Sequence, residues 1–266
     1  MDTVLVTGGT GHLGRDLVRL LKPAHRVRVL SRSRGDDPDV EWVRGDLATG
    51  AGVAEAVAGV RTVVHAATWS PAARRGYLLP TDFVRTPPDV DVHGTRRLLD
   101  EAARAGVGHF AYVSVVGADR PRLPYLRVKR EAERLVRAGG VPWSVLRATQ
   151  FHWLTDRMLS RAARMPVLPV PADLDVQPVD SADFAGYVAD RVVAGPGGRC
   201  DDFGGPDVLS SGVLVAQWQR FRARSARTVR LPVPARAARA ARGLTCPWGH
   251  RGTTTWSAWL QANPPW

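Results

Sequence analysis

The sequence predicts an α/β fold, a doubly wound parallel sheet followed by a small C-terminal α+β subdomain. A β-branched run at residues 3–7 leads into a glycine-rich turn and then into leucines at helical spacing. Short apolar runs then alternate with helical segments as far as residue 147, the pattern of a parallel sheet covered by helices. The 266 residues suit one large domain of this kind, with or without a small appendage.

The first half of the chain supplies most of the predicted elements. Strands are expected where short runs are apolar or β-branched, at residues 3–7, 26–30, 41–43, 61–65, 109–115 and 142–147. Helices are expected at 13–21, 53–57, 92–105 and 125–138, and glycines follow the last two. We place the core at 1–150 and a smaller, substrate-binding subdomain, packed on that core, at 151–266.

Beyond Arg147 the pattern is looser. Extended pieces are expected at 166–171, 177–179 and 229–233, and helices at 181–193, 208–224, 234–242 and 254–260. The short and mixed elements of this region predict a subdomain rather than a second sheet of comparable size.

The chain carries a formal net charge of +12, almost entirely as arginine. Lys22 and Lys129 are its two lysines, and nine arginines but no acidic residue follow Asp207. One interpretation is an arginine-favouring coding bias on solvated faces; the other is a basic surface for an acidic partner or anionic substrate. A nucleic-acid partner is not favoured, because no helix-turn-helix, zinc-finger or RNA-binding signature is present.

Cysteines and apolar runs exclude several other classes. Cys200 and Cys246 lie far apart and outside any Cys/His cluster, so we expect neither a disulfide framework nor a bound metal. The first residues lack a basic segment typical of a signal peptide, and no apolar run reaches membrane-spanning length. We therefore expect a cytoplasmic protein with no membrane partner.

The strongest motif is the turn after the first strand, Thr7-Gly8-Gly9-Thr10-Gly11-His12-Leu13-Gly14. Glycines here allow a tight bend, close approach of a pyrophosphate to the backbone, and close packing of the helix on the strand. The helix N-terminus then directs N–H groups at the anion. The motif predicts a dinucleotide site, with these cofactor-binding residues: Thr7, Gly8, Gly11, His12, Leu13 and Gly14.

The end of the second strand indicates which dinucleotide binds. Ser31, Arg32 and Arg34 stand where NAD-binding proteins place an acidic residue for the ribose hydroxyls. Arginines suit a 2′-phosphate instead, so NADP(H) is favoured over NAD(H). The alternative is that both are ordinary surface arginines.

A candidate proton relay follows the fifth strand. Tyr125 and Lys129 are four residues apart and share one face of a helix. The lysine charge is expected to lower the pKa of the phenol and so suit it to acid–base work. Ser114 ends the preceding strand, where it can orient a carbonyl. The alternative is an amphipathic helix with an exposed lysine.

These motifs resemble the short-chain dehydrogenase/reductase superfamily. Residues 125–136, 140–151 and 177–185 narrow the resemblance to the NmrA-like, atypical NAD(P)H-binding reductases. The resemblance implies a Rossmann fold in which Ser114 orients the substrate, Tyr125 is the acid/base, and Lys129 tunes Tyr125 and holds the nicotinamide ribose. It also implies that Asp46 and Leu47 lie at the adenine and that Ala66 and Ala67 line the middle of the cofactor.

Asp46 and His65 are polar residues at strand ends that can serve the fold rather than a ligand. Asp46 can equally form a turn or a helix cap. His65, which ends the fourth strand, suggests metal binding or acid–base chemistry, but a histidine there is more often packed in the core.

Two segments are candidates for substrate contact. Thr149, Gln150 and Phe151 follow the sixth strand at the sheet edge that binds ligands in such folds, although core packing explains Phe151 equally well. Trp69, Tyr77 and Phe83 lie in the stretch after the fourth strand, which is either a cover for an apolar substrate or a surface loop.

Together these features predict an NADPH-dependent oxidoreductase that acts on a carbonyl, enone or quinone of a small hydrophobic metabolite. A non-catalytic NAD(P)-sensing regulator or scaffold is the first alternative, and a redox-neutral isomerase or epimerase is the second. A small-molecule substrate is the expected partner, and the protein is expected to be a monomer or homodimer.

Overall fold

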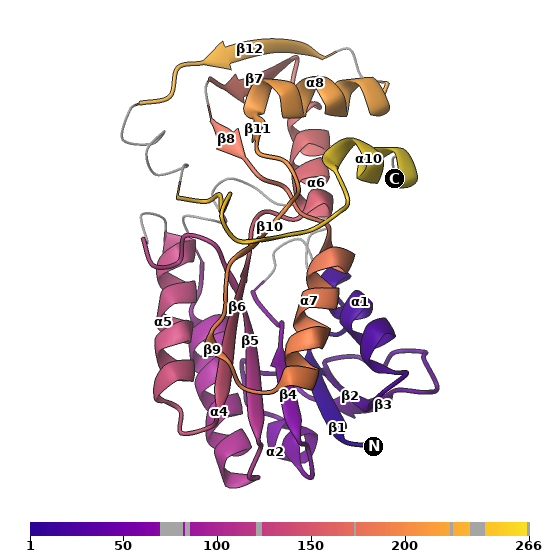
Figure 1. Cartoon of the computed structure of the whole chain (residues 1–266), viewed down its shortest axis with the longest axis vertical. Coiled ribbons are helices and arrows are strands. Elements are labelled where there is room, and N and C mark those ends of the chain that lie inside the picture. The colour runs from indigo at the N-terminus through magenta and orange to yellow at the C-terminus, as the bar shows by residue number, and fades with distance from the viewer. Residues whose placement is uncertain are drawn as a thin grey trace.

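A computed structural model shows a large parallel sheet with helices on both faces and a smaller lobe beyond one end of it (Figure 1). The structure describes residues 1–69, 82, 86–120, 124–172, 174–223, 226–234 and 243–264. Within these residues, every strand pair of the large sheet is parallel.

The order of strands in the large sheet defines the fold. From one edge to the other they are β3 (Glu41–Arg44), β2 (Arg26–Ser31), β1 (Thr3–Thr7), β4 (Thr62–His65), β5 (His109–Val115), β6 (Trp143–Ala148), β10 (Phe203–Gly204) and β13 (His250–Arg251), with β9 (Gly198–Arg199) also paired to β6. The order 3-2-1-4-5-6 is that of the doubly wound Rossmann fold, so the predicted fold class is confirmed.

Helices cover both faces because the strand residues alternate between two cores. Val4 and Val6 pack under α1 (His12–Leu21) and α7 (Ser181–Ala194), whereas Leu5 packs on the opposite side. That second face is covered by α2 (Val53–Val57), α4 (Thr95–Arg104) and α5 (Pro124–Ala138) (Figure 1).

The smaller lobe has a core of its own. Two short sheets, β7 (Val167–Pro171) with β12 (Arg227–Leu231) and β8 (Asp175–Val176) with β11 (Leu209–Ser210), pack with α6 (His152–Ala162), α8 (Ser211–Phe221) and α10 (Trp256–Ala262). Trp218 and Trp256 are its largest fully buried side chains. Strands β9, β10 and β13 come from the same part of the chain but join the large sheet, and the boundary at residue 150 stays a prediction.

Several elements differ from expectation. Helix α6 was not predicted, because its N-cap, Phe151, supplies no side-chain capping signal. The helix expected from 208 begins at Ser211, since residues 209–210 form β11. The helix expected from 92 becomes α-helical at Thr95, because Asp89–Gly94 form a π-helical turn. Residues 235–242 of another expected helix lie outside the described residues.

Candidate active site

The glycine-rich turn between β1 and α1 is tightly packed at Gly9 and Gly14. A Cβ on Gly14 would lie 2.0 Å from the Gly8 carbonyl oxygen, and a Cβ on Gly9 would lie 2.8 Å from Val29. At Gly11 the nearest described atom to such a Cβ is again the Gly8 oxygen, at 3.3 Å, and no other lies within 4 Å. The turn is therefore open beside Gly11, where a ligand can approach the backbone.

Helix α1 begins at this opening. Gly11 is its N-cap and provides no capping side chain, so the backbone N–H groups of the first turn are not satisfied by a cap. Leu13 is buried in the core below and offers only its backbone. A helix N-terminus with free N–H groups favours a phosphate, and the cradle at Gly11 fits the pyrophosphate of a dinucleotide.

The side chain of His12 packs against the smaller lobe. Its ring stacks on Trp153 of α6, with centroids 4.1 Å apart and planes 6° apart. Burial, with the charges of Arg15 and Arg157, lowers the pKa of His12, so the ring is neutral at pH 7. Trp153 was not singled out from the sequence, yet it joins the glycine-rich turn to the smaller lobe.

Ala66 and Ala67 lie directly against the turn, and their contact with the cofactor stays a prediction. The Ala66 N–H donates to the Thr7 carbonyl at 3.2 Å, and the Ala67 N–H donates to Thr7 Oγ1 at 3.3 Å. A Cβ on Gly8, whose φ is +75°, would lie 2.8 Å from the Ala67 nitrogen. The ends of β1 and β4 thus form one continuous wall.

His65 has a structural role in this wall. Its Nδ1 lies 2.6 Å from Thr7 Oγ1 and its Nε2 lies 2.9 Å from Thr95 Oγ1. Because Thr95 donates its own proton to the Asp91 carbonyl at 2.6 Å, we assign His65 Nε2–H as the donor to Thr95, and Nδ1 accepts from Thr7. Burial and the charge of Lys129 lower the pKa of His65 to about 3. The ring is a neutral part of the core rather than an acid–base group.

The exits of β2 and β3 lie at the same sheet edge. Arg32 and Arg34 are exposed and follow Ser31, the last residue of β2. Asp46 Oδ1 accepts the N–H of Ala48 at 2.9 Å, which is a turn role. Leu47 is buried in the core. The adenine role of Asp46 and Leu47 stays a prediction.

Tyr125 and Lys129 lie on the face of α5 that packs on the sheet. Lys129 is 4% exposed, and its Nζ lies 2.8 Å from Asp91 Oδ1. Asp91, itself 1% exposed, lies in the π-helical turn and also accepts from Thr68 Oγ1 at 2.7 Å and from the Trp69 N–H at 2.8 Å. The alternative of an exposed lysine is therefore wrong.

The pKa values of Lys129 and Tyr125 are set by burial and by the charge of Asp91. Burial alone would lower the pKa of Lys129, but the Asp91 carboxylate raises it, so the ammonium stays charged. Burial raises the pKa of Tyr125; Lys129 opposes that rise and Asp91 adds to it. The expected lowering of the Tyr125 pKa was wrong, because burial and the Asp91 charge outweigh the lysine charge. Tyr125 is a protonated phenol at neutral pH.

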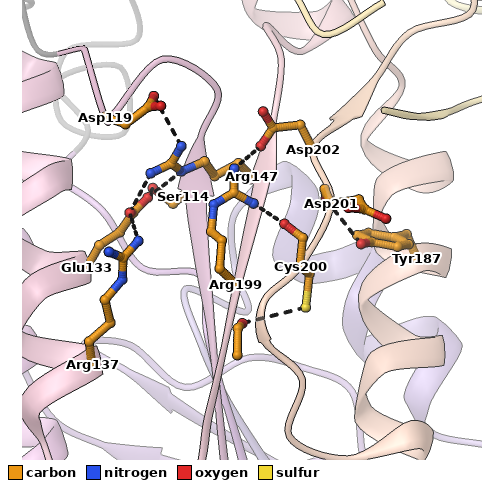
Figure 2. A network of polar contacts seen from close by, with 11 residues as sticks. Ser114, Asp119, Glu133, Arg137, Arg147, Tyr187, Arg199, Cys200, Asp201 and Asp202 are labelled. Carbon is orange, nitrogen blue, oxygen red and sulfur yellow. Dashed lines mark hydrogen bonds and ion pairs between the residues drawn. The ribbon is translucent and has the colours of Figure 1, made fainter. Parts of the chain in front are cut away.

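Ser114 lies at the predicted end of β5, but its hydroxyl is already hydrogen-bonded within the protein. Its hydroxyl donates to Glu133 Oε1 at 2.6 Å, inside a buried cluster that also contains Arg147 (Figure 2). Side chains alternate along a strand, and Ser114 and Tyr112 share the face of β5 that α5 covers. The Ser114 hydroxyl proton is bound to the Glu133 carboxylate, and a substrate carbonyl would have to compete for it. The orienting role of Ser114 stays a prediction.

The exit of β6 carries buried polar atoms that have no partner among the described residues. These are Thr149 Oγ1 and Gln150 Oε1. The Gln150 amide group instead donates through Nε2 to the Leu244 carbonyl at 3.2 Å. Buried polar atoms are normally paired, so a bound ligand is a natural partner for these two. Phe151 packs on Phe184, with ring centroids 6.0 Å apart, which favours its core-packing alternative.

The other substrate candidates are only partly described. Trp69 is half-buried and binds Asp91 through its backbone N–H. Tyr77 and Phe83 lie outside the described residues. Trp69 therefore contributes a backbone anchor to the site, and a cover over substrate stays a prediction.

Asp91 and Glu133 are the two functional candidates that sequence reasoning missed. Each is buried on its helical segment; Asp91 lies between Val90 and Val92, and Glu133 lies between Ala132 and Val136 on the buried face of α5. An acid on the apolar face of a helix was the available signal, since buried carboxylates require a partner.

Other kinds of site find no support in the described part of the chain. No group of three or more His, Cys, Asp or Glu residues there is arranged to hold a metal ion. None of its helices has the length and hydropathy needed to cross a bilayer.

The doubly wound sheet and the open glycine cradle at Gly11 are the features of a dinucleotide-binding protein. A family model described as NAD(P)H-binding matches residues 8–191. The chain belongs to this NAD(P)H-binding family and is an NAD(P)-dependent oxidoreductase of the atypical short-chain dehydrogenase/reductase type, as the resemblance predicted.

Individual relatives agree with this assignment. The (4-alkanoyl-5-oxo-2,5-dihydrofuran-3-yl)methyl phosphate reductase of Streptomyces griseus is 32% identical over 238 residues, which cover 87% of this chain and 78% of that protein. The chloroplastic divinyl chlorophyllide a 8-vinyl-reductase of Oryza sativa is 30% identical over 228 residues; the match covers 77% of this chain but only 54% of that longer protein.

Solved structures show the same fold. A dTDP-glucose 4,6-dehydratase from Streptomyces venezuelae, determined with NAD bound, aligns with a TM-score of 0.72 at 21% identity. The alignment covers 87% of this chain and 85% of the dehydratase. At this identity the likeness concerns the fold alone.

Proposed function

We propose that this protein is an NADPH-dependent reductase of a carbonyl, or of a carbon–carbon double bond conjugated to a carbonyl, in a small hydrophobic substrate. The observation that carries the proposal is the α5 face on which Tyr125 lies beside Lys129, with Lys129 held by Asp91 at 2.8 Å. This arrangement places an acid and a fixed positive charge together at the end of the sheet where ligands bind in such folds.

When bound in the Gly11 cradle, a nicotinamide dinucleotide would supply a hydride to the substrate carbon, and negative charge would then develop on the carbonyl oxygen. Tyr125 donates its phenolic proton to that oxygen. Its raised pKa keeps the proton in place at pH 7, which suits donation and hence the reducing direction. Lys129 remains charged and stabilises the phenolate until a proton from solvent restores it.

The cofactor is held by parts of the chain that meet at one sheet edge. The backbone of the Gly11 cradle would hold the pyrophosphate, and Ala66 and Ala67 would line the middle of the dinucleotide. Arg32 and Arg34 are exposed at the end of β2, where they bind a 2′-phosphate. NADP(H) is accordingly the preferred cofactor.

A conjugated lactone or related enone is the substrate class that we favour. The Streptomyces griseus relative acts, by its name, on a 5-oxo-2,5-dihydrofuran with an alkanoyl group and a methyl phosphate, and the rice relative reduces a vinyl group. An acyl oxo-dihydrofuran, with and without its methyl phosphate, therefore heads the substrate panel, followed by quinones and simple carbonyls.

The decisive experiment replaces Tyr125 by phenylalanine and measures NADPH oxidation on this panel. Loss of a positioned acid lowers the rate by about 10²- to 10⁴-fold, while NADPH affinity is unchanged. Tyr187→Phe is the matched control, because its hydroxyl donates to the Asp201 carbonyl beside α7. An unchanged rate removes Tyr125 from the mechanism. Tight cofactor binding without turnover of any compound supports the sensing alternative, and a rearranged product without net oxidation of NADPH supports an isomerase.

Cofactor preference has a separate test. We expect Arg32→Ala and Arg34→Ala each to weaken NADPH binding by about 10-fold or more, since each removes a charge-assisted hydrogen bond, and to leave NADH binding unchanged. Arg26→Ala is the control, because Arg26 is exposed at the opposite end of the same strand. Tighter binding of NADH than of NADPH by the unaltered protein contradicts the assignment.

A further inference from the structure

The buried cluster around Glu133 lies on the same helix as the proposed acid. Tyr125, Lys129 and Glu133 follow one another at four-residue spacing along α5, so the three side chains form one stripe. Lys129 and Glu133 are 4% and 2% exposed. Whatever fixes the rotation of Glu133 about the helix axis therefore also fixes the direction of Lys129 and Tyr125.

Glu133 is held by two neighbouring strands at once. Arg147 of β6 donates from Nε to Oε1 and from Nη2 to Oε2, both at 2.7 Å, and Ser114 of β5 donates to Oε1 at 2.6 Å. Ser114 and Arg147 are paired directly in the β5–β6 register. Figure 2 shows the carboxylate enclosed by these groups and by Arg137 of the next helical turn. A planar, bidentate pair of this kind fixes direction as well as distance.

Arg147 also contacts the loop after β5 and lies close in the chain to the polar residues at the exit of β6. Its Nη1 lies 3.2 Å from Asp119, in the loop that follows β5, and it stands two residues before Thr149. The cluster thus ties the helix that carries the acid to the strand exit that carries the unpartnered polar atoms. One ion pair, between Glu133 and Arg147, therefore joins α5 to β6 just before its exit.

Stability alone does not explain a pair this deeply buried. Removing two charges from water costs about as much as their attraction returns, and apolar residues of similar volume are often equally stable or more so. What an apolar pair does not supply is a defined orientation, because its contacts have no direction.

We propose that Glu133 and Arg147 form a positioning pair that sets the rotation of α5, and through it the places of Tyr125 and Lys129 relative to the β6 exit. The inference rests on the proposed function, in which these two residues act on the substrate. Glu133 and Arg147 act through the helix and need touch neither substrate nor cofactor.

The test replaces the pair by apolar residues, Glu133→Met with Arg147→Met, and compares it with Glu133→Gln and with Glu131→Gln. Glu131 is the matched control, because it lies on the same helix in a solvent-exposed pair with Arg134 at 3.1 Å. We expect the double variant to fold and to bind NADPH with unchanged affinity and KM. Its kcat falls by about 10- to 100-fold, as for a misplaced catalytic group, and the pH dependence of kcat shifts. Glu133→Gln behaves similarly and Glu131→Gln like the unaltered protein.

A second measurement is independent of turnover. Amide hydrogen exchange of residues 125–130 reports directly on how firmly the first turns of α5 are held. Faster exchange there in the double variant, and not in Glu131→Gln, supports the inference. If the unaltered protein turns over no substrate, that result contradicts the proposed function but not the positioning role of the pair. A double variant with unchanged kcat, pH profile and exchange overturns the inference and leaves the proposed function intact.

Discussion

Replacing Asp91 by asparagine removes the carboxylate that pairs with Lys129 while keeping the shape of the side chain. Three donors converge on Asp91: Lys129 Nζ and Thr68 Oγ1 on Oδ1, and the Trp69 N–H on Oδ2. Asparagine retains one acceptor oxygen and places an NH₂ group at the other position. At least one of the three donors then faces another donor and loses its bond.

The size of the effect follows from burial. The side chains of Lys129 and Asp91 are 5% and 1% exposed, and removing one partner of such a pair costs about 3–5 kcal/mol. The penalty has an upper bound, because Lys129 can release its proton. At pH 7 that costs about 4.6 kcal/mol for a lysine of ordinary pKa near 10.4, and at pH 9 about 2 kcal/mol. Asp91→Asn should therefore destabilise the fold by about 4 kcal/mol at pH 7 and by about 2 kcal/mol less at pH 9.

Urea unfolding followed by circular dichroism at both pH values measures these differences. Asp89→Asn is the control, because Asp89 is exposed in the same π-helical turn, and we expect it to change stability by less than about 0.5 kcal/mol. The sign is fixed by linkage. In the Asp91→Asn variant, the pKa of Lys129 is lower in the folded protein than in the unfolded chain. The stability of the variant therefore rises with pH until the pH reaches the pKa of lysine in the unfolded chain. If Asp91→Asn costs no more than Asp89→Asn at pH 7, the reasoning about this pair is refuted.

Two further predictions concern the turn and the core. Gly14→Ala places a Cβ 2.0 Å from the Gly8 carbonyl oxygen, so we expect it to abolish NADPH binding and to lower stability by about 2–3 kcal/mol. Gly186→Ala is the control on α7, where the added Cβ would meet no neighbouring described atom within 4 Å, and we expect it to stabilise the protein by about 0.5–1 kcal/mol. Thermal unfolding and cofactor titration check both, and normal binding by Gly14→Ala contradicts the cradle. His65 stays neutral in the fold down to about pH 3 but is protonated near pH 6.5 when unfolded, so stability falls as the pH drops through this window. At pH 5 the loss from His65 is about 2 kcal/mol. A His65→Gln variant with the same pH dependence as the unaltered protein would show that another group is responsible.

Most of the large sheet could be predicted because its strands are marked by local chemistry. Each of the first six is a short apolar run bounded by turn residues, and side-chain alternation assigns it to two cores. The strands beyond β6 could not be predicted, since β9, β10 and β13 have two residues each and form through pairing with β6 or with one another. A contact between residues far apart in the chain leaves no periodicity in so short a segment.

In the candidate site, too, features set by local sequence could be predicted and features set by tertiary contacts could not. Tyr125 and Lys129 were predicted because helical spacing is a local property, and the structure places both on the sheet face of α5. Asp91 was missed because its partner is 38 residues away and belongs to another element. The predicted direction of the Tyr125 pKa shift was wrong because burial and the Asp91 charge both depend on tertiary packing. Ser114 occupies the expected strand end, but its bond to Glu133 depends on how two strands and a helix meet.

The extension of the sheet beyond β6 bears on how the protein can be synthesised and altered. Residues 1–150 leave the ribosome first and can begin to fold, since chains fold from the N-terminus during synthesis. The outer edge of β6 nevertheless has to wait for residues 198–204, and β10 in turn waits for residues 250–251. Until then the nascent chain presents an uncovered strand edge, which is a site of unwanted pairing. A fusion or deletion that disturbs residues 250–251 would therefore lower the yield of folded protein, although these residues lie outside the proposed site.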